Sequence, residues 1–295
     1  MSWRTIVVSG YAKLDYKMEY LVIRKTDETK RVHLSEIGVL IVESTAVSLT
    51  SALLCEMMKK KVKVIFCDAQ HNPQSELLAY YGSHDSSIKI KKQIGWAESV
   101  KKLIWTEIVA EKIRKQSELL AEAKCTEQAE MLVQYIREMK TGDISNREGH
   151  AAKVYFNALF GMDFTRSADS SVNAALNYGY GILLSYFNRE IVSNGYLTQL
   201  GIFHDNIFNP YNLASDFMEP FRIIVDRRVK KINPVKFEQE EKMNVLDFLN
   251  EGVIIDGKRN YVGNAIKIYC KSLIDALNES DVSLIKFYKN IKDEL

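Results

Sequence analysis

Leu213-Ala-Ser-Asp-Phe-Met-Glu-Pro-Phe-Arg-Ile-Ile-Val-Asp-Arg-Arg-Val-Lys-Lys231 is the most informative stretch of the sequence. Its apolar side chains recur at helical spacing and predict a buried helix. These side chains are Phe217, Phe221, Ile224, Val225 and Val229. Pro220 lacks an N–H group and is suited to a first helical turn, so we expect the helix over 216–231 to begin near Ser215 or Asp216.

Charged side chains follow one another three or four residues apart along the same stretch, a spacing that places them on one side of a helix. They are Asp216, Glu219, Arg222 and Asp226. Buried charge is costly unless it is paired or bound to a metal ion. Two interpretations stay open on this stretch alone. The acids form a capping box and pairs along the helix, or they belong to a functional site.

Length and composition limit the possible classes of protein. The chain has 295 residues, enough for two domains, and its 46% hydrophobic and 26% charged content is ordinary for a globular protein. It contains no apolar run near the roughly 18 residues of a membrane span. The first residues read as a strand rather than as a signal peptide. Four dispersed cysteines argue against a zinc site or a disulfide scaffold, and we expect a protein of the prokaryotic cytoplasm.

The hydrophobic pattern predicts an α+β fold in which a small β-rich domain over 1–72 precedes a larger all-α domain over 91–295. Residues 73–90 are polar and turn-forming, as in a linker between domains. Within 1–72 we expect one helix, over 48–61. The expected strands cover 3–8, 19–24, 31–34, 38–43 and 62–67. This first domain contains no candidate for chemistry.

Helical periodicity continues through the second domain. We expect helices over 91–122, 126–139, 146–160, 169–193, 216–231, 244–251 and 260–279. The first of these has a basic face, which is either solvated or follows DNA phosphates. That face consists of Lys89, Lys91, Lys92, Lys101, Lys102, Lys112, Arg114 and Lys115. Tyr178-Gly-Tyr-Gly181 predicts close packing between helices, because small residues let two backbones approach.

Two further segments contain candidate site residues. In Ser145-Asn-Arg-Glu148, the first and last residues match a capping box, yet Glu148 shares a helix face with small and apolar side chains and could meet another helix. In Leu200-Gly-Ile-Phe-His204, Gly201 allows a tight turn that exposes His204 or directs it into a cleft. Each residue also has a plain structural explanation.

Taken together, these segments resemble the CRISPR-associated integrase, the larger subunit of the spacer-acquisition complex. The resemblance is carried by Glu148-x-x-x-Ala-x-x-Tyr-Phe, by Gly-x-x-His204 and by Asp216-x-x-Glu219-x-x-Arg222-x-x-x-Asp226. It extends to 169–180, and segments 2–8, 33–37, 64–68 and 81–87 look like the branch found in type II systems. Many members carry Asp where this chain has Glu219, and a glutamate can still bind a divalent ion.

The resemblance implies that Glu148, His204 and Glu219 bind Mg²⁺ or Mn²⁺ and are the catalytic residues. It implies an enzyme that inserts short DNA duplexes, the spacers, into a CRISPR array. Its expected partners are double-stranded DNA (the spacer precursor and the repeat with its leader), a second copy of the chain and a small ferredoxin-like adaptation protein. A type II effector nuclease and a ring-shaped DNA-end-binding protein are further implied partners.

Elementary chemistry agrees with this assignment. Two carboxylates about 4 Å apart repel by roughly 4 kcal/mol at an effective dielectric constant of 20, and a divalent cation between them reverses that cost. The basic residues that follow suit a DNA backbone. These are Arg222, Arg227, Arg228, Lys230 and Lys231. A non-catalytic DNA-binding assembly protein with structural acids remains the alternative, and a metal-dependent nuclease would share the same site.

The sequence also bears on the type of reaction. It contains no Gly-rich phosphate loop and no Ser or Tyr paired with a base. Exchange of one phosphodiester for another requires neither. We therefore expect direct transesterification by a 3′-hydroxyl, without ATP and without a covalent protein–DNA intermediate.

Overall fold

The computed structural model describes residues 4–78 and 83–291. The chain divides into two compact units, residues 1–82 and 83–295. The first residue of the strand expected over 3–8, the opening residues of the resemblance and its Tyr81-Gly82 pair lie outside the described part.

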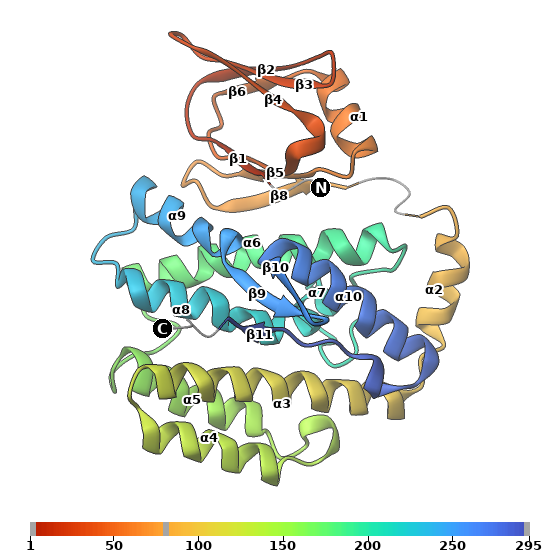
Figure 1. Ribbon diagram of the computed structural model, residues 1–295, viewed down its shortest axis with the longest axis vertical. Helices are drawn as coiled ribbons and strands as arrows, with labels where there is room; N and C mark the ends of the chain where they lie inside the picture. The colour runs from red at the N-terminus through yellow and green to blue at the C-terminus, as the bar shows by residue number, and fades with distance from the viewer. Residues whose placement is uncertain (1–3, 79–82, 292–295) are drawn as a thin grey trace. The chain divides into compact units, whose positions relative to one another are not determined.

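The described part of the first unit contains two four-stranded sheets and a helix, α1 (Ser51–Lys59) (Figure 1). One sheet has parallel β1 (Arg4–Val8), β5 (Ile37–Val42) and β7 (Lys63–Cys67), with β8 (Pro73–Leu77) antiparallel to β7. The other has the order β4 (Thr29–His33), β3 (Tyr20–Arg24), β2 (Ala12–Lys17) and β6 (Val47–Leu49), in which only β2 and β6 pair in parallel.

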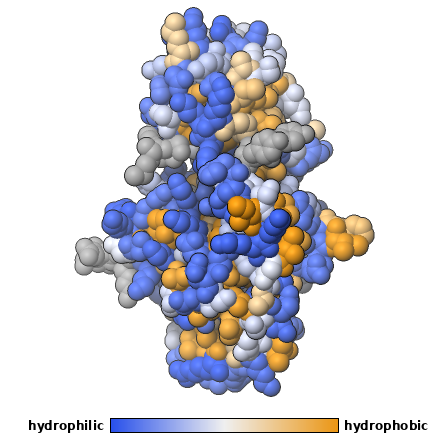
Figure 2. Space-filling view, turned by 90° about the vertical axis from the view of Figure 1, so that its right-hand side faces the viewer, coloured by the Kyte–Doolittle hydropathy of each residue, from blue (hydrophilic) through white to orange (hydrophobic). Residues whose placement is uncertain are grey.

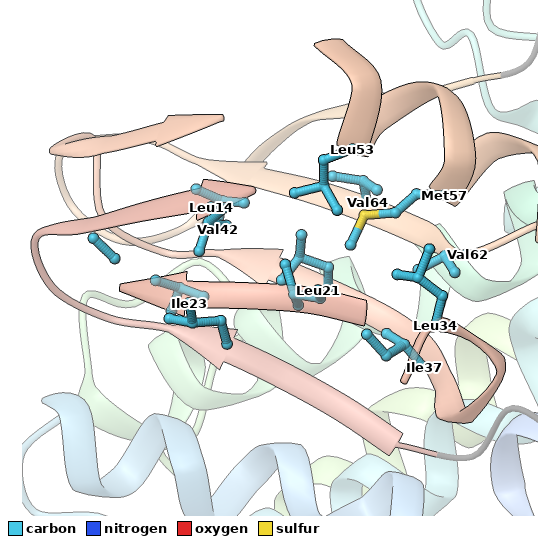
Figure 3. Close-up of a cluster of buried hydrophobic side chains, with 13 residues drawn as sticks. Leu14, Leu21, Ile23, Leu34, Ile37, Val42, Leu53, Met57, Val62 and Val64 are labelled. Carbon is cyan, nitrogen blue, oxygen red and sulfur yellow. The ribbon is translucent and has the colours of Figure 1, made fainter. Parts of the chain in front are cut away.

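A single apolar cluster joins these elements (Figure 3). Leu14 and Leu21 enter it from β2 and β3, Val64 enters it from β7, and Leu53 and Met57 enter it from α1. All five are fully buried. Such burial of alternate strand positions against a helix is the main stabilising term in a small domain. The prediction of an N-terminal β-rich region is confirmed.

Three strands of this unit escaped the sequence analysis. β2 carries charged side chains at its outward positions, and β6 is only three residues long, so neither gives a strong apolar signal. β8 lies in the polar segment 73–90, and its Glu76 pairs with the buried Lys63 of β7. The segment expected to be a linker thus contains a strand, and it also contains the start of the helix α2 (Ser86–Ile94).

The described part of the second unit is mostly helical, as predicted. After α2 come α3 (Glu98–Glu122), α4 (Thr126–Glu138), α5 (Arg147–Phe160), α6 (Ser171–Ser193), α7 (Asn212–Met218), α8 (Arg222–Ile232), α9 (Gln239–Leu246) and α10 (Val262–Glu279). The expectation of an all-α domain is corrected by a small antiparallel sheet of β10 (Lys258–Tyr261), β9 (Gly252–Ile255) and β11 (Lys289–Asn290). α3 packs against α4 and α5, which run alongside it (Figure 1).

The single helix expected over 91–122 is interrupted after Ile94. Trp96 in the interruption is buried, its indole Nε1–H donates to Asn278 Oδ1 at 3.1 Å, and its ring stacks on Tyr196. This anchor turns the chain between α2 and α3. The expected basic face is also wrong in part, because Lys112 and Lys115 are buried.

The stretch 213–231 is not one helix. α7 ends at Met218, a 3-10 turn covers Glu219–Phe221, and α8 begins at Arg222. Pro220 has no N–H for a helical hydrogen bond, so the α-helix cannot continue through this position. The expected start near Ser215 is wrong as well. The side-chain amide of Asn212 donates to the carbonyls of Gln199 and Asn206 and fixes an earlier start.

On the face shown in Figure 2, hydrophilic side chains dominate and apolar groups form small separate patches. None of the helices in the described ranges has the length and apolar character needed to cross a membrane. Apolar side chains are thus used chiefly in the interiors of the two units.

Candidate active site

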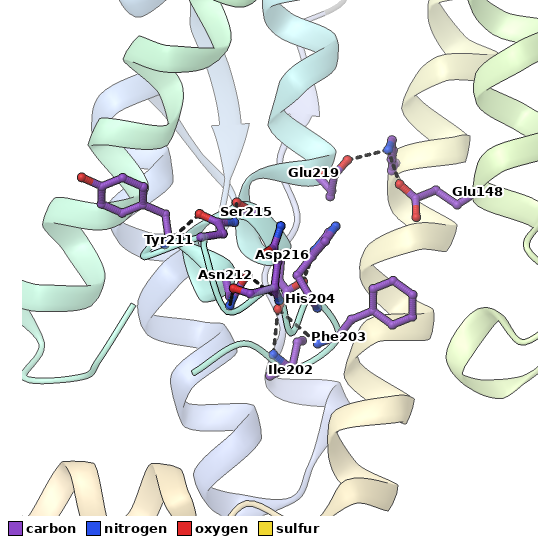
Figure 4. A network of polar contacts seen from close by, with 12 residues as sticks. Glu148, Ile202, Phe203, His204, Tyr211, Asn212, Ser215, Asp216 and Glu219 are labelled. Carbon is purple, nitrogen blue, oxygen red and sulfur yellow. Dashed lines mark hydrogen bonds and ion pairs between the residues drawn. The ribbon is translucent and has the colours of Figure 1, made fainter. Parts of the chain in front are cut away.

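Two glutamates from separate helical segments meet at one lysine. Glu148 lies in the first turn of α5, Glu219 in the 3-10 turn before α8, and Lys112 on α3. Lys112 Nζ is 2.5 Å from Glu148 Oε1 and 2.5 Å from Glu219 Oε2. Glu148 Oε1 and Glu219 Oε2 are therefore separated by at most twice 2.5 Å. Figure 4 shows Glu148 and Glu219 directed toward each other across this position.

The break between α7 and α8 directs Glu219 inward. The carbonyl of Pro220, freed by the break, accepts a hydrogen bond from Tyr288 Oη at 3.1 Å. Glu219 is 3% exposed, and its Oε1 accepts from Arg222 Nε at 2.9 Å. The Arg222 guanidinium in turn lies over the ring of Tyr180. Glu219 is thus held between two cations, Lys112 and Arg222.

Glu148 is free to face the site because another residue caps α5. Asp143 Oδ1 accepts the Arg147 N–H at 2.7 Å, and Asp143 Oδ2 accepts the Glu148 N–H at 2.9 Å. The expected capping box from Ser145 is absent from this helix start, where Asn146 occupies the cap position without a side-chain bond. The carboxylate of Glu148 therefore takes no part in capping.

His204 is positioned by the buried carboxylate of Asp216. Its Nδ1 lies 2.5 Å from Asp216 Oδ1, and Asp216 also accepts the N–H groups of Ile202, Phe203 and His204 at 2.7, 3.1 and 3.1 Å. A Cβ at Gly201 would come within 2.2 Å of the His204 carbonyl, so this loop requires glycine. Asp216 therefore supports the His204 loop and does not cap α7.

The orientation of His204 follows from these contacts. Because Nδ1 is engaged by Asp216, the Nε2 atom is the one available to a ligand. The imidazole also meets the Trp105 ring edge-on at 5.7 Å, and Trp105 stacks on Phe203 at 4.3 Å. Trp105 lies on α3, two turns before Lys112, so one helix supports both sides of the site.

The charges around these side chains shift their titration. Burial alone would raise the pKa of Glu219, but the charges of Arg222 and Lys112 outweigh it and hold that pKa well below its ordinary value. Burial opposes charge on Lys112, yet Glu219 and Glu148 together raise the pKa of its ammonium group. The hydrogen bond to Asp216 raises the pKa of His204, against the effect of burial. At neutral pH Glu219 is therefore ionised and Lys112 is charged.

The donor set is chemically suited to a divalent cation. Carboxylate oxygens and one imidazole nitrogen are ligands for Mn²⁺ and, through the oxygens, for Mg²⁺. Glu219 Oε2 is buried and makes no hydrogen bond of good geometry, although it faces the Lys112 ammonium. Over residues 4–78 and 83–291, no three His, Cys, Asp or Glu side chains are grouped closely enough to hold an ion as they stand. The structure thus brings Glu148 and Glu219 together at Lys112, and it does not group His204 with them closely enough to bind an ion.

Asp226, the last acid of the stripe, lies apart from this cluster. Its Oδ2 accepts from Tyr155 Oη at 2.9 Å, and its Oδ1 accepts from Tyr180 Oη. Burial raises the pKa of Asp226 to about 6. The three acids along 213–231 therefore have different roles. Asp216 orients a loop, Glu219 faces Lys112, and Asp226 joins α8 to two tyrosines.

The basic residues after Glu219 are largely engaged within the chain. Arg227 forms a two-point pair with Glu122 at 3.0 Å, and Arg228 pairs with Asp247 at 2.8 Å. Lys230 donates to the carbonyl of Leu159. Lys231 is exposed near the end of α8. Arg222 is the member of this group that reaches the candidate site.

Lys112 is the site residue that the sequence analysis assigned wrongly. It follows Trp105 by seven residues and Ile108 by four, which places it on the buried face of α3. This spacing from two apolar residues could have shown, from the sequence alone, that Lys112 is buried. Asp216 was singled out, but its role could not be found from local spacing, because its partners lie in a loop twelve to fourteen residues earlier.

Comparisons with known proteins agree on one family. The family described as CRISPR associated protein Cas1 matches residues 6–247. The CRISPR-associated endonuclease Cas1 of Neisseria meningitidis serogroup C (strain 8013) is 36% identical over 229 residues, which cover 78% of this chain and 75% of that protein. The match spans both units of the chain.

Solved structures share the fold at low sequence identity. A casposase bound to integration product is similar with a TM-score of 0.77 and 18% identity, covering 96% of this chain and 92% of the other. A chain of a Cas6-RT-Cas1–Cas2 complex is similar with a TM-score of 0.74 and 17% identity. The similarity covers 99% of the present chain and 36% of that longer chain. With the family match over most of its length, this chain belongs to the Cas1 family of CRISPR-associated proteins.

Proposed function

We propose that this chain is a DNA integrase with endonuclease chemistry that inserts short DNA duplexes into a CRISPR array. The observation that carries the proposal is the convergence of Glu148 and Glu219, which are far apart in sequence, on the ammonium group of Lys112. Two acids that meet in this way repel each other unless a cation lies between them, and Glu219 is also buried. The Cas1 family membership supports a role in CRISPR adaptation.

In this proposal Glu148, Glu219 and the Nε2 atom of His204 hold Mg²⁺ or Mn²⁺. When bound, such an ion polarises a phosphodiester and lowers the pKa of an attacking hydroxyl. Asp216 keeps the His204 ring in place, and Trp105 packs against its edge. Lys112 and Arg222 supply positive charge for a DNA phosphate.

The proposed reaction is a direct transesterification. The 3′-oxygen of the incoming duplex forms a bond to phosphorus at the end of a repeat, and the bond from that phosphorus to the leaving 3′-oxygen breaks. One phosphodiester replaces another, so ATP is not needed. A duplex ending in a 3′-deoxy sugar should therefore not be joined, and denaturing gels should show no DNA attached to protein. Integration of the deoxy-terminated duplex at the normal rate would contradict this mechanism.

The proposed partners follow from the family resemblance. We expect a homodimer that binds spacer DNA and the leader-proximal repeat together with a small ferredoxin-like protein. The type II branch, with its effector nuclease and ring-shaped DNA-end-binding protein, is part of the proposal. Among the expected DNA contacts, Lys231 is favoured because it is exposed, and Arg222 because it reaches the candidate site through Glu219. Arg227, Arg228 and Lys230 pair with groups outside that site.

Substitution of the three proposed ligands tests this function. We expect E148Q, H204A and E219Q to reduce insertion into a supercoiled repeat-bearing plasmid by at least about a hundredfold, as loss of metal chemistry does. Gln is used for the glutamates because it keeps their size and an oxygen that Lys112 and Arg222 can contact. DNA affinity should change little, and each variant should remain folded.

E111Q is the matched control, since Glu111 is also a buried, ion-paired acid but on the part of α3 that faces Arg114 and Lys115. It should keep its integration activity. Activity that falls only in proportion to melting temperature in all four variants would contradict a catalytic role.

A non-catalytic DNA-binding assembly protein is the second candidate. It is favoured by one observation, that Lys112 already neutralises both glutamates without any metal ion. Under this alternative the cluster is a structural ion pair. Insertion assays with the wild type in Mg²⁺, Mn²⁺ and EDTA separate the two candidates, because a structural cluster predicts no metal-dependent product.

A further inference from the structure

Lys112 is an unusual neighbour for a pair of catalytic acids. Its side chain is 11% exposed, and the side chain of Glu219 is 4% exposed. The ammonium group lies at hydrogen-bonding distance from both glutamates, between the two carboxylates that the proposed function assigns to a divalent ion. A metal ion and this ammonium group cannot share that position.

The charges of the cluster balance without any metal. Glu148 and Glu219 contribute two negative charges, and Lys112 and Arg222 contribute two positive charges that contact them. Addition of a doubly charged ion to these four groups would leave an excess of two positive charges. Such an excess is unfavourable beside Lys112 and Glu219, which are largely withdrawn from solvent.

We propose that Lys112 is a resident counter-ion that must leave the two glutamates before a divalent ion binds, so that ion loading is coupled to the arrival of a DNA phosphate. The inference rests on the proposed function. It assigns Lys112 a positioning role, because the residue acts through the two glutamates and not on the reacting atoms.

The coupling has a physical basis in the lysine side chain. Its ammonium is a compact charge on a flexible four-carbon stem, so it can turn toward a nearby phosphate. A DNA phosphate at the site supplies the negative charge that compensates the incoming ion and receives the displaced ammonium. By thermodynamic linkage, DNA then tightens ion binding and the ion tightens DNA binding by the same factor.

The test compares Mn²⁺ affinity of the wild type with that of K112M, K112Q and the control K115M by isothermal titration calorimetry without DNA. Lys115 is buried on the same helix but pairs with Glu118 and Glu111 away from the site. Removal of a competing cation should tighten Mn²⁺ binding by K112M and K112Q by about tenfold or more. K115M should match the wild type.

A second series adds a short DNA duplex, with titration of Mn²⁺ into the duplex alone subtracted. DNA should tighten Mn²⁺ binding by the wild type at least about fivefold, a typical coupling factor, and should tighten K112Q less. Equal Mn²⁺ affinity of the wild type and both Lys112 variants would overturn the inference. So would an equal effect of DNA on all of them.

Two further measurements keep the test decisive. Melting curves establish whether each variant is folded. If a Lys112 variant does not fold, NMR of labelled lysine in the wild type replaces the titration of that variant. A buried lysine signal should then shift on addition of Mg²⁺, and the absence of any shift would overturn the inference. Failure of the proposed function appears differently, because then no variant binds Mn²⁺ and E219Q behaves like the wild type.

Discussion

At the scale of single residues, Asp226 gives the clearest test of the buried polar network. The residue is 1% exposed, and its carboxyl group accepts hydrogen bonds from the hydroxyls of Tyr155 and Tyr180. Burial raises its pKa to about 6. The folded protein therefore keeps a proton on this group at pH values where the unfolded chain, with a pKa of about 3.9, has lost it.

Because the folded state binds the extra proton, the contribution of Asp226 to stability falls as pH rises from about 4 to 6 and stays low above pH 6. We expect D226N to remove this dependence and to raise the free energy of unfolding at pH 7 by up to about 3 kcal/mol, at about 1.4 kcal/mol for each pH unit between the two pKa values. Asn is nearly isosteric and can both accept from and donate to the two tyrosines.

The measurement is urea unfolding of both proteins between pH 4 and 8. D256N, at an exposed turn aspartate, is the control and should follow the wild-type curve. A difference between D226N and the wild type that does not vary with pH would contradict the expectation.

At the scale of elements, Gly179 determines how closely α6 packs on α8. A Cβ at this position would lie 2.4 Å from Val225 Cγ1 and 3.2 Å from Val245 Cγ1. The sequence prediction of close helix packing at 178–181 is confirmed for this glycine. We expect G179A to lower the free energy of unfolding by about 2 kcal/mol, since overpacking outweighs the better helix propensity of Ala.

The double variant G179A/V225A tests the cause. V225A alone should destabilise the protein by leaving a cavity, but it removes the atom that the new Cβ would meet. In that background the further cost of G179A should mostly disappear in urea unfolding curves. Additive losses from the two substitutions would show that the close approach is not the reason for glycine at this position.

At the scale of the whole molecule, the first unit is the expected place of self-association. It has no candidate chemistry, and the strands β1 and β4 are edges of its two sheets in the described part of the chain. We predict a two-fold dimer, the commonest symmetric assembly. Light scattering at micromolar concentration should give twice the 33.8 kDa mass of one chain, and a monomer mass across the range would contradict the prediction.

From the sequence alone, the β-rich region, most of the helices and the candidate site residues could be predicted. Apolar alternation predicted the β-rich region, helical spacing predicted most of the helices, and Glu148, His204 and Glu219 stood in a recognisable order. These signals are local, because period and spacing depend on neighbours within a few turns. Strands with charged outward faces, such as β2, and the short β9–β11 sheet give too weak a local pattern.

Only the tertiary structure decided what each charged residue does. Asp216 and Asp226 lie in the same acidic stripe as Glu219, yet one orients the His204 loop and the other receives two tyrosine hydroxyls. Lys112 looked like a surface cation, and in the structure it contacts both Glu148 and Glu219. The physical reason is that the cost or benefit of a buried charge depends on partners from distant segments, and sequence spacing contains no information about those partners.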